Sequence, residues 1–245
     1  MYHNKKILLV DDEVGLLDML KIILTKERFT DITTATTALE ALEKIKKENY
    51  DLLLLDVNLP DFSGFELCTQ IRQFSYVPII FLTACDGNLD KITGLALGGD
   101  DYIVKPFDPL EVVARIKTIL RRQTQYVVMT PVQSETPVHN APTIFDYGTF
   151  QVNLSDATLT VNGEQIQCTA TEFELLSFFC QNPNHVFTST QLYESVWNEI
   201  GYKEDKTVSI YISKLRKKLN DDPKSPSIIL NLRGIGYKFV PPKRG

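Results

Sequence analysis

Residues 52–64, LLLLDVNLPDFSG, decide the fold of the first half of the chain. Four consecutive leucines are typical of a strand that is buried on both faces, as in the parallel sheets of α/β proteins. The apolar run stops at Asp56, so this strand would deliver one carboxylate to the edge of a sheet. Pro60 and Gly64 then predict a loop that exposes this acid before the next helix begins.

The segments on either side repeat this pattern, because short apolar runs that end abruptly alternate with stripes at helical spacing. The predicted strands are 6–10, 29–34, 51–55, 77–82 and 101–104, and the predicted helices lie at 16–24, 38–45, 65–71, 92–96 and 112–120. Strands alternating with helices indicate βα units on a parallel sheet that is covered on both faces. We therefore predict an α/β domain over residues 1–122.

The rest of the chain has a different pattern. Residues 123–143 hold three prolines among many polar residues and predict a flexible linker. Residues 144–245 predict a second, α+β domain. Its first part alternates at period two and contains the hairpin signal Asn162-Gly163. Three helical segments follow at 171–180, 189–197 and 205–219, and two short strands end the domain.

Composition excludes some classes of protein. The 245 residues are 43% hydrophobic and 23% charged, but no apolar run approaches the roughly 20 residues needed to cross a bilayer, and the N-terminus is unlike a secretory signal. Cys68, Cys85, Cys168 and Cys180 lie far apart and form no CxxC motif. We therefore expect reduced thiols in a cytoplasmic protein with no membrane partner.

The distribution of charge predicts a polyanionic partner. The chain has a net charge of −5, yet the segment 203–244 contains 11 basic and four acidic residues, a net charge of +7. A basic surface at one end of an acidic protein is typical of nucleic-acid binding.

Polar side chains collect at four strand ends of the first domain: Asp11 and Asp12, Asp56, Thr83, and Lys105. Ligands bind at the carboxyl ends of strands in an open parallel sheet. Any one of these residues alone is more often a helix cap. Together, three acids would raise one another's pKa unless a cation neutralised them, and oxygen ligands favour Mg²⁺. The pattern predicts phosphoryl transfer, with Asp56 as nucleophile and Lys105 as the balancing charge.

Five segments carry a resemblance to a known family: ILLVDDE, LLLLDVNLPDFSGFE, PIIFLTA, DDYIVKPF and NLRGIGYKF. The chain resembles the OmpR/PhoB family of two-component response regulators over nearly its whole length outside the linker. The resemblance implies a flavodoxin-like (βα)5 receiver domain followed by a winged helix-turn-helix domain. It implies that Asp56 accepts the phosphoryl group, that Asp12, Asp56 and the carbonyl of Asn58 hold Mg²⁺, and that Asp11 acts through water.

The resemblance also implies a switch and a dimer. Lys105, before a cis peptide bond to Pro106, would pair with a phosphoryl oxygen, Thr83 would follow the phosphoryl group, and Tyr102 would swing inward, unless it is an ordinary half-buried aromatic. A homodimer would form on phosphorylation. Its predicted residues are an apolar patch (Ile92, Leu95, Ala114) and three crossing ion pairs (Lys91 with Glu111, Asp101 with Arg115, Asp100 with Arg122), although any one such pair is more often a solvated helix charge.

The basic stretch KTVSIYISKLRKKL, residues 206–219 of the third predicted helix, is expected to enter a DNA major groove. A basic helix face alone is more often simply solvated, but this one follows two short helices and precedes a glycine-bracketed hairpin. The resemblance implies that Lys214 and Ser213 read bases and that Lys206, Thr207, Tyr211 and Arg216 contact phosphates. It also implies that Arg233 of the hairpin reaches the minor groove and that Tyr237 contacts the DNA backbone. The resemblance further implies that the loop 197–203 meets RNA polymerase.

Three functions are compatible with a nucleophilic aspartate and a basic C-terminal segment. The first is a transcription regulator, not an enzyme, that is switched by a sensor histidine kinase and binds promoter DNA. The second is a Mg²⁺-dependent phosphatase of the haloacid-dehalogenase type; such enzymes carry a second aspartate two residues after the nucleophile, where this chain has Asn58. The third is a DNA-binding protein whose first domain dimerises without phosphorylation, but the loss of an acid or of the lysine that marks such proteins is not seen here.

Overall fold

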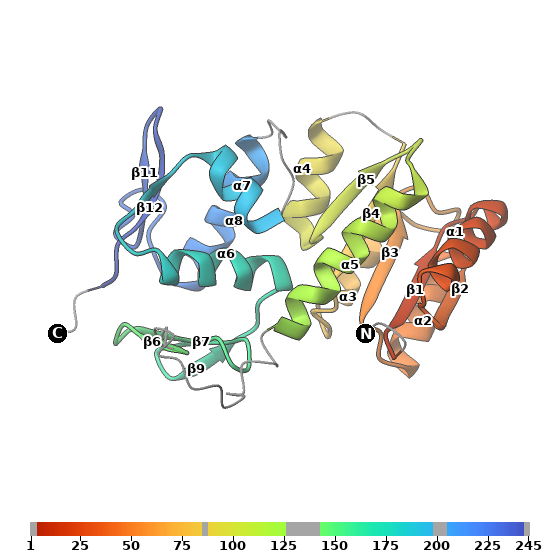
Figure 1. The fold of residues 1–245 in the computed structure, drawn as a ribbon, viewed down its shortest axis with the longest axis horizontal. Coiled ribbons are helices and arrows are strands. Elements are labelled where there is room, and N and C mark those ends of the chain that lie inside the picture. Colours follow the sequence, from red (N-terminus) through yellow and green to blue (C-terminus); the bar gives the residue numbers. More distant parts are fainter. Residues whose placement is uncertain (1–3, 85–87, 126–142, 198–204, 243–245) are drawn as a thin grey trace, which may run out of the picture. The chain divides into compact units, whose positions relative to one another are not determined.

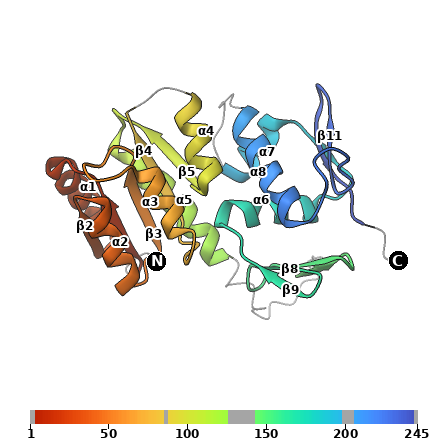
Figure 2. The same cartoon turned by 180° about the vertical axis from the view of Figure 1, so that it is seen from behind.

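The computed structural model describes residues 4–84, 88–125, 143–197 and 205–242. The chain divides into two compact units near residue 120, and each is described by itself (Figures 1 and 2). The predicted linker falls mostly outside the described residues, as do residues 198–203 of the loop assigned to RNA polymerase.

The first unit is built on a five-stranded sheet whose order is β2-β1-β3-β4-β5 and whose pairs are all parallel. The strands are β1 (Lys6–Val10), β2 (Asp31–Ala35), β3 (Leu52–Asp56), β4 (Ile79–Thr83) and β5 (Asp101–Val104), and the helices are α1 (Val14–Lys26), α2 (Ala38–Lys47), α3 (Gly64–Ile71), α4 (Asn88–Leu97) and α5 (Pro109–Gln125). The predicted α/β architecture is confirmed. Helix α5 runs three residues past the domain boundary that we placed at residue 122.

Both faces of this sheet are covered, which is why β3 is leucine on both sides. Leu52 and Leu54 belong to one core cluster with the inner faces of α1 and α5, whereas Leu53 and Leu55 point to the opposite face and are equally buried. Figure 1 shows α5 in front of the sheet, and Figure 2, seen from behind, shows α3 in front of it.

The second unit begins with an antiparallel sheet and ends with a winged helix-turn-helix. Its elements are β6 (Ile144–Asp146), β7 (Phe150–Asn153), β8 (Thr158–Val161), β9 (Glu164–Ile166), α6 (Ala170–Gln181), β10 (Val186–Phe187), α7 (Ser189–Trp197), α8 (Asp205–Lys218), β11 (Ile229–Leu232) and β12 (Gly236–Phe239). Asn162 and Gly163 both have positive φ, 52° and 85°, as the predicted hairpin turn requires. Strand β10, which joins β11 and β12 in a second sheet, was not predicted because two residues carry no periodicity.

Aromatic rings join the parts of this unit. The ring of Phe239 on β12 lies 6.2 Å from that of Phe179 on α6 and 5.5 Å from that of Tyr147 beside the first sheet. These contacts pack α6 and the loop after β6 against β12. Within the described part of the chain, no helix is both long and apolar enough to cross a membrane.

Candidate functional site

The predicted acidic cluster assembles at the carboxyl ends of the strands of the first unit. Carboxylate oxygens of Asp11, Asp12 and Asp56 all lie within 4.8 Å of one another. Asp11 follows β1 and Asp56 ends β3, and these strands are neighbours in the sheet. Asp11 and Asp56 are buried, with exposed fractions of 0% and 3%, and Asp12 is exposed.

Lys105, directly after β5, faces two of these acids. Its Nζ lies 2.6 Å from Asp11 Oδ2 and 3.2 Å from Asp56 Oδ1. Burial, the largest single influence, lowers the pKa of Lys105, but the hydrogen bond to Asp11 and the two negative charges outweigh it and raise the pKa. The predicted cis peptide bond between Lys105 and Pro106 is confirmed.

The Asp56 carboxyl is electrostatically unusual. Burial, followed by the charge of Asp11, raises its pKa to about 6, although Lys105 acts in the opposite direction. Asp56 Oδ1 faces the Lys105 ammonium at 3.2 Å and has no other donor near it among the residues that the structure describes. One ammonium does not balance three clustered carboxylates, so the oxygen ligands present here fit a bound divalent cation such as Mg²⁺.

A backbone hydrogen bond closes the loop that follows Asp56. Gly64 donates its N–H to the carbonyl of Val57 at 2.9 Å, and a Cβ on Gly64 would lie 2.1 Å from the carbonyl oxygen of Asp56, so only glycine fits. Asn58 is exposed in this loop, where its carbonyl was predicted to bind the metal.

Asp61 attaches the same loop to helix α2. Its two carboxylate oxygens accept the N–H groups of Ala38 and Leu39 at 2.9 and 2.8 Å. These N–H groups have no partner within the helix, so Asp61 acts as a cap from 22 residues away. Burial is the largest influence on the pKa of Asp61 and raises it, but the hydrogen bonds together lower it below its ordinary value.

The two predicted switch residues are both inside the domain. Thr83 ends β4 with an exposed fraction of 3%, and Tyr102 on β5 has one of 6%. Tyr102 therefore already lies in an inward position in this structure, whereas the resemblance implies that it turns inward on phosphorylation.

The charged residues predicted to pair across a dimer are engaged within the chain. Arg115 contacts Asp101 at 2.9 Å and Glu111 at 2.8 Å. Asp100 has no exposed surface; it accepts the N–H of Ile79 at 3.1 Å and lies 3.3 Å from Arg72. Each acid sits close to a basic residue or a strand N–H of its own domain. The predicted partners Lys91 and Arg122 have side chains outside the described set.

The structure supports only part of the apolar patch that was predicted for the dimer interface. Leu95 is 1% exposed, so it belongs to the interior and cannot join a surface patch. Ala114 on α5 is exposed, as predicted, and the side chain of Ile92 lies outside the described set. The sequence missed this burial because the inner and outer faces of α4 are both apolar.

Helix α8 of the second unit presents a narrow polar face. Lys206, Ser209, Ser213 and Lys217 are exposed at helical spacing. Tyr211 is fully buried, its ring 5.1 Å from that of Trp197, and Thr207 is 2% exposed. This burial contradicts the prediction that Tyr211 and Thr207 contact phosphates.

Two other predicted DNA contacts are tied to their own domain. Lys214 Nζ lies 3.6 Å from Glu172 Oε1, and Arg216 Nε and Nη2 donate to the carbonyl of Ile229 at 3.0 and 2.5 Å. The structure therefore does not support Lys214 as a base reader or Arg216 as a phosphate contact, because each head group is held by a buried partner.

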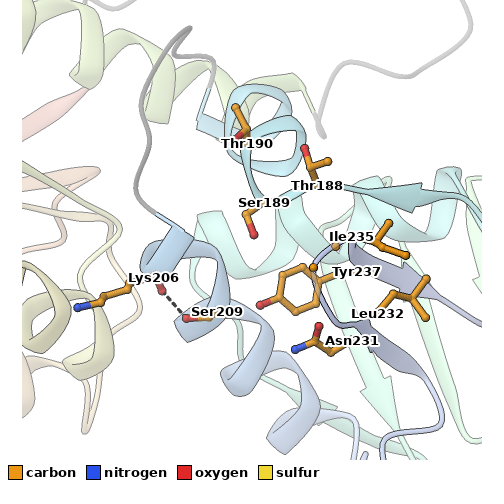
Figure 3. Close-up of a pocket in the computed structure, with 11 residues that line it drawn as sticks. Thr188, Ser189, Thr190, Lys206, Ser209, Asn231, Leu232, Ile235 and Tyr237 are labelled. Carbon is orange, nitrogen blue, oxygen red and sulfur yellow. Dashed lines mark hydrogen bonds between the residues drawn. The ribbon is translucent and has the colours of Figure 1, made fainter.

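A pocket of about 500 Å³ lies where the start of α7, the start of α8 and the β11–β12 hairpin meet. In Figure 3 the ring of Tyr237 and the amide of Asn231 project from the hairpin toward Ser209 on α8, whereas the Lys206 ammonium points away. Arg233 is exposed at the hairpin, and Tyr237 is 9% exposed. Sequence reasoning missed Asn231, because only the fold brings it next to the helix.

Comparisons with known proteins identify a protein family for each of the two units. Residues 7–117 match the response regulator receiver domain, and residues 163–239 match the C-terminal domain of transcriptional regulatory proteins. The transcriptional regulatory protein YvrH of Bacillus subtilis is 43% identical over 99% of this chain and 98% of its own. The DNA-binding response regulator MtrA of Mycobacterium tuberculosis is 36% identical over 98% of both chains.

Solved structures match this chain across both units. A RitR mutant matches with a TM-score of 0.72 and 27% identity over 96% of this chain and 99% of its own. The response regulator DrrB of Thermotoga maritima, described as an OmpR/PhoB homolog, has a TM-score of 0.50 and 29% identity over the same shares.

An acidic receiver pocket followed by a winged helix defines a response regulator with a DNA-binding output. This chain belongs to the OmpR/PhoB family of such regulators. It is a DNA-binding transcription regulator that is controlled by phosphorylation, as the sequence predicted.

Proposed function

We propose that a sensor histidine kinase phosphorylates Asp56, and that the phosphorylated chain forms a homodimer on promoter DNA and engages RNA polymerase. The observation that carries the proposal is the pairing of Asp56, whose pKa is raised, with Lys105 at 3.2 Å. We also propose that it works in the cytoplasm, since Cys68, Cys168 and Cys180 form no disulfide.

The proposed reaction takes place at the carboxyl ends of the strands, where the three acids and Lys105 meet. A carboxylate oxygen of Asp56 attacks the phosphorus of the donor, an acyl phosphate bond forms, and the bond from phosphorus to the donor nitrogen breaks. Lys105 stands beside the oxygen that attacks and can neutralise charge on the transferred group. Asp12, Asp56 and the carbonyl of Asn58 would hold Mg²⁺ directly and Asp11 through water, and the ion would supply further positive charge to the phosphoryl oxygens.

The kinase is proposed to dock beside these strand ends. A depression of about 490 Å³ is lined by Leu16 and Met19 of α1 and by Pro106 and Phe107 after β5, with Lys105 at its edge. An apolar depression that shares a residue with the reacting site suits a protein that must bring its own phosphohistidine to Asp56.

The chain is proposed to act as a switch, not as an enzyme with sustained turnover. A phosphatase with an aspartyl nucleophile needs a general acid, and Asn58 stands where that acid would be. The phosphorylated form would therefore persist long enough to carry a signal.

On DNA, the exposed residues of α8 and the hairpin replace several of the residues first predicted. Ser209 and Ser213 are the candidates for base reading, and Lys206, Lys217 and Arg233 are the exposed bases for phosphate contacts. Three such contacts give a salt slope of about −2.7 per protomer in log affinity against log salt.

The test of the phosphorylation site is a mass measurement. Wild type and Asp56→Asn are incubated with a small phosphodonor and Mg²⁺, and the intact mass of each is recorded. Only the wild type should gain one phosphate. An equal gain in Asp56→Asn would mean that another residue accepts the phosphoryl group.

A further inference from the structure

Glu172 is a buried acid on α6 that contacts two lysines of α8. It is the third residue of α6, its side chain is 4% exposed, and it forms a capping box with Thr169. Its carboxylate also lies 3.6 Å from Lys214 and 3.2 Å from Lys218, both on α8. One acid on α6 thus holds two basic residues of the helix that is expected to enter DNA.

These contacts divide the four lysines of α8 into two sets. Lys206 and Lys217 are exposed. The side chains of Lys214 and Lys218 are only 17% and 18% exposed. The Lys214 ammonium also lies 5.0 Å from the centre of the Tyr211 ring, and Lys218 donates to the carbonyl of Gln167. Adjacent lysines in the sequence, Lys217 and Lys218, therefore have opposite environments.

We propose that Glu172 determines DNA specificity by withholding Lys214 and Lys218 from the phosphate backbone. Phosphate contacts raise affinity for every sequence alike, whereas contacts to base edges distinguish sequences. When Glu172 holds two lysines of α8, fewer residues of that helix contact phosphates, which are the same in every DNA sequence. A larger share of the binding free energy then comes from Ser209 and Ser213, the candidates for contacts to base edges. Glu172 is thus a positioning residue that acts through the two lysines.

The size of the effect follows from counterion release. Each added phosphate contact steepens the slope of log affinity against log salt by about 0.9. A contact that contributes nothing at 1 M salt therefore adds about eightfold in affinity at 0.1 M. Releasing one or both lysines should raise non-specific affinity in proportion.

A purely structural role for Glu172 predicts the opposite sign. If the acid only fixed α8 against α6, its loss would loosen the helix and weaken binding to all DNA. The conservative variant Glu172→Gln separates the two roles, because glutamine can keep the capping box with Thr169 while the charge that holds the lysines is removed.

The experiment uses the full chain and a short duplex without a target site, with affinity measured by fluorescence anisotropy at several salt concentrations. Glu172→Gln should bind about eightfold more tightly at 0.1 M salt for each lysine released, with a slope steeper by about 0.9 for each. Adding Lys218→Met to Glu172→Gln should remove the part of the gain that this lysine carries.

Two variants with the native Glu172 test the proposal independently of whether Glu172→Gln folds. Lys217→Met should flatten the slope by about 0.9, and Lys218→Met should leave it unchanged. Equal flattening in both variants, or weaker binding by a folded Glu172→Gln, would overturn the proposal. A wild type with no salt-dependent DNA affinity would instead overturn DNA binding itself.

Discussion

Replacing Asp56 by asparagine should stabilise the receiver domain at neutral pH when no divalent cation is present. The folded domain raises the pKa of Asp56 from 3.8 to about 6. A carboxyl with a raised pKa binds its proton more tightly in the folded state, so folding stability falls as pH rises from about 4 to 6 and stays reduced above that range. Asparagine keeps the shape of the protonated acid without this loss.

The magnitude comes from the same shift. A change of about two pKa units at about 1.4 kcal/mol per unit is about 3 kcal/mol at pH 7.5. At pH 5, between the unfolded and folded pKa values, the advantage of Asp56→Asn should be roughly half as large. Mg²⁺ at ten times its dissociation constant should recover about 1.4 kcal/mol for the wild type by binding only its folded form.

The assay is urea unfolding of the full chain in EDTA at pH 5 and pH 7.5. The single tryptophan, Trp197, lies in the second unit, so its fluorescence reports that unit, and far-UV circular dichroism adds the receiver transition. An advantage of the same size at both pH values would refute the reasoning, because it would show that the charge of Asp56 is not its cause. So would a wild type that is the more stable protein at pH 7.5 without metal.

Three further predictions follow from the structure. Gly64→Ala should lower the free energy of unfolding of the receiver domain, measured in urea, by about 3 kcal/mol, because the new Cβ would lie 2.1 Å from a backbone oxygen. The control Gly15→Ala on helix α1, where a Cβ would meet nothing within 4 Å, should be neutral or stabilising. Equal losses of stability in the two variants would refute the steric argument. Asp61→Ala and Thr37→Ala each remove a cap of α2, so each should lower the free energy of unfolding by about 1 kcal/mol. Only Asp61 lies in the loop that follows Asp56, so only Asp61→Ala should weaken Mg²⁺ binding measured by calorimetry. Equal Mg²⁺ affinity in the two variants would show that the Asp61 contact does not position the metal ligands. Ala114→Asp should prevent dimerisation with a phosphoryl mimic in sedimentation without affecting folding, and a mutant that still dimerises places the interface elsewhere.

The sequence by itself determined the receiver fold and its reacting site. The run LLLLD at 52–56 requires cover on both faces, and that requirement defines a parallel sheet between helices. Once the sheet is parallel, the residues after its strands must meet at one edge, so Asp11, Asp56 and Lys105 could be brought together without coordinates. Each step depends on neighbouring residues and on one rule of topology.

Only the tertiary structure decided which side chains face solvent. Leu95 and Tyr211 are buried, and Asp100 is held by Arg72, through contacts with segments far away in the sequence. Lys214 stands on the helix as the sequence predicts, but its ammonium is held by Glu172, which lies 42 residues earlier. The spacing of apolar residues predicts which face of a helix a residue lies on, to within about one residue. The direction in which a long side chain points depends instead on the hydrogen-bonding or charged group that the fold places beside it.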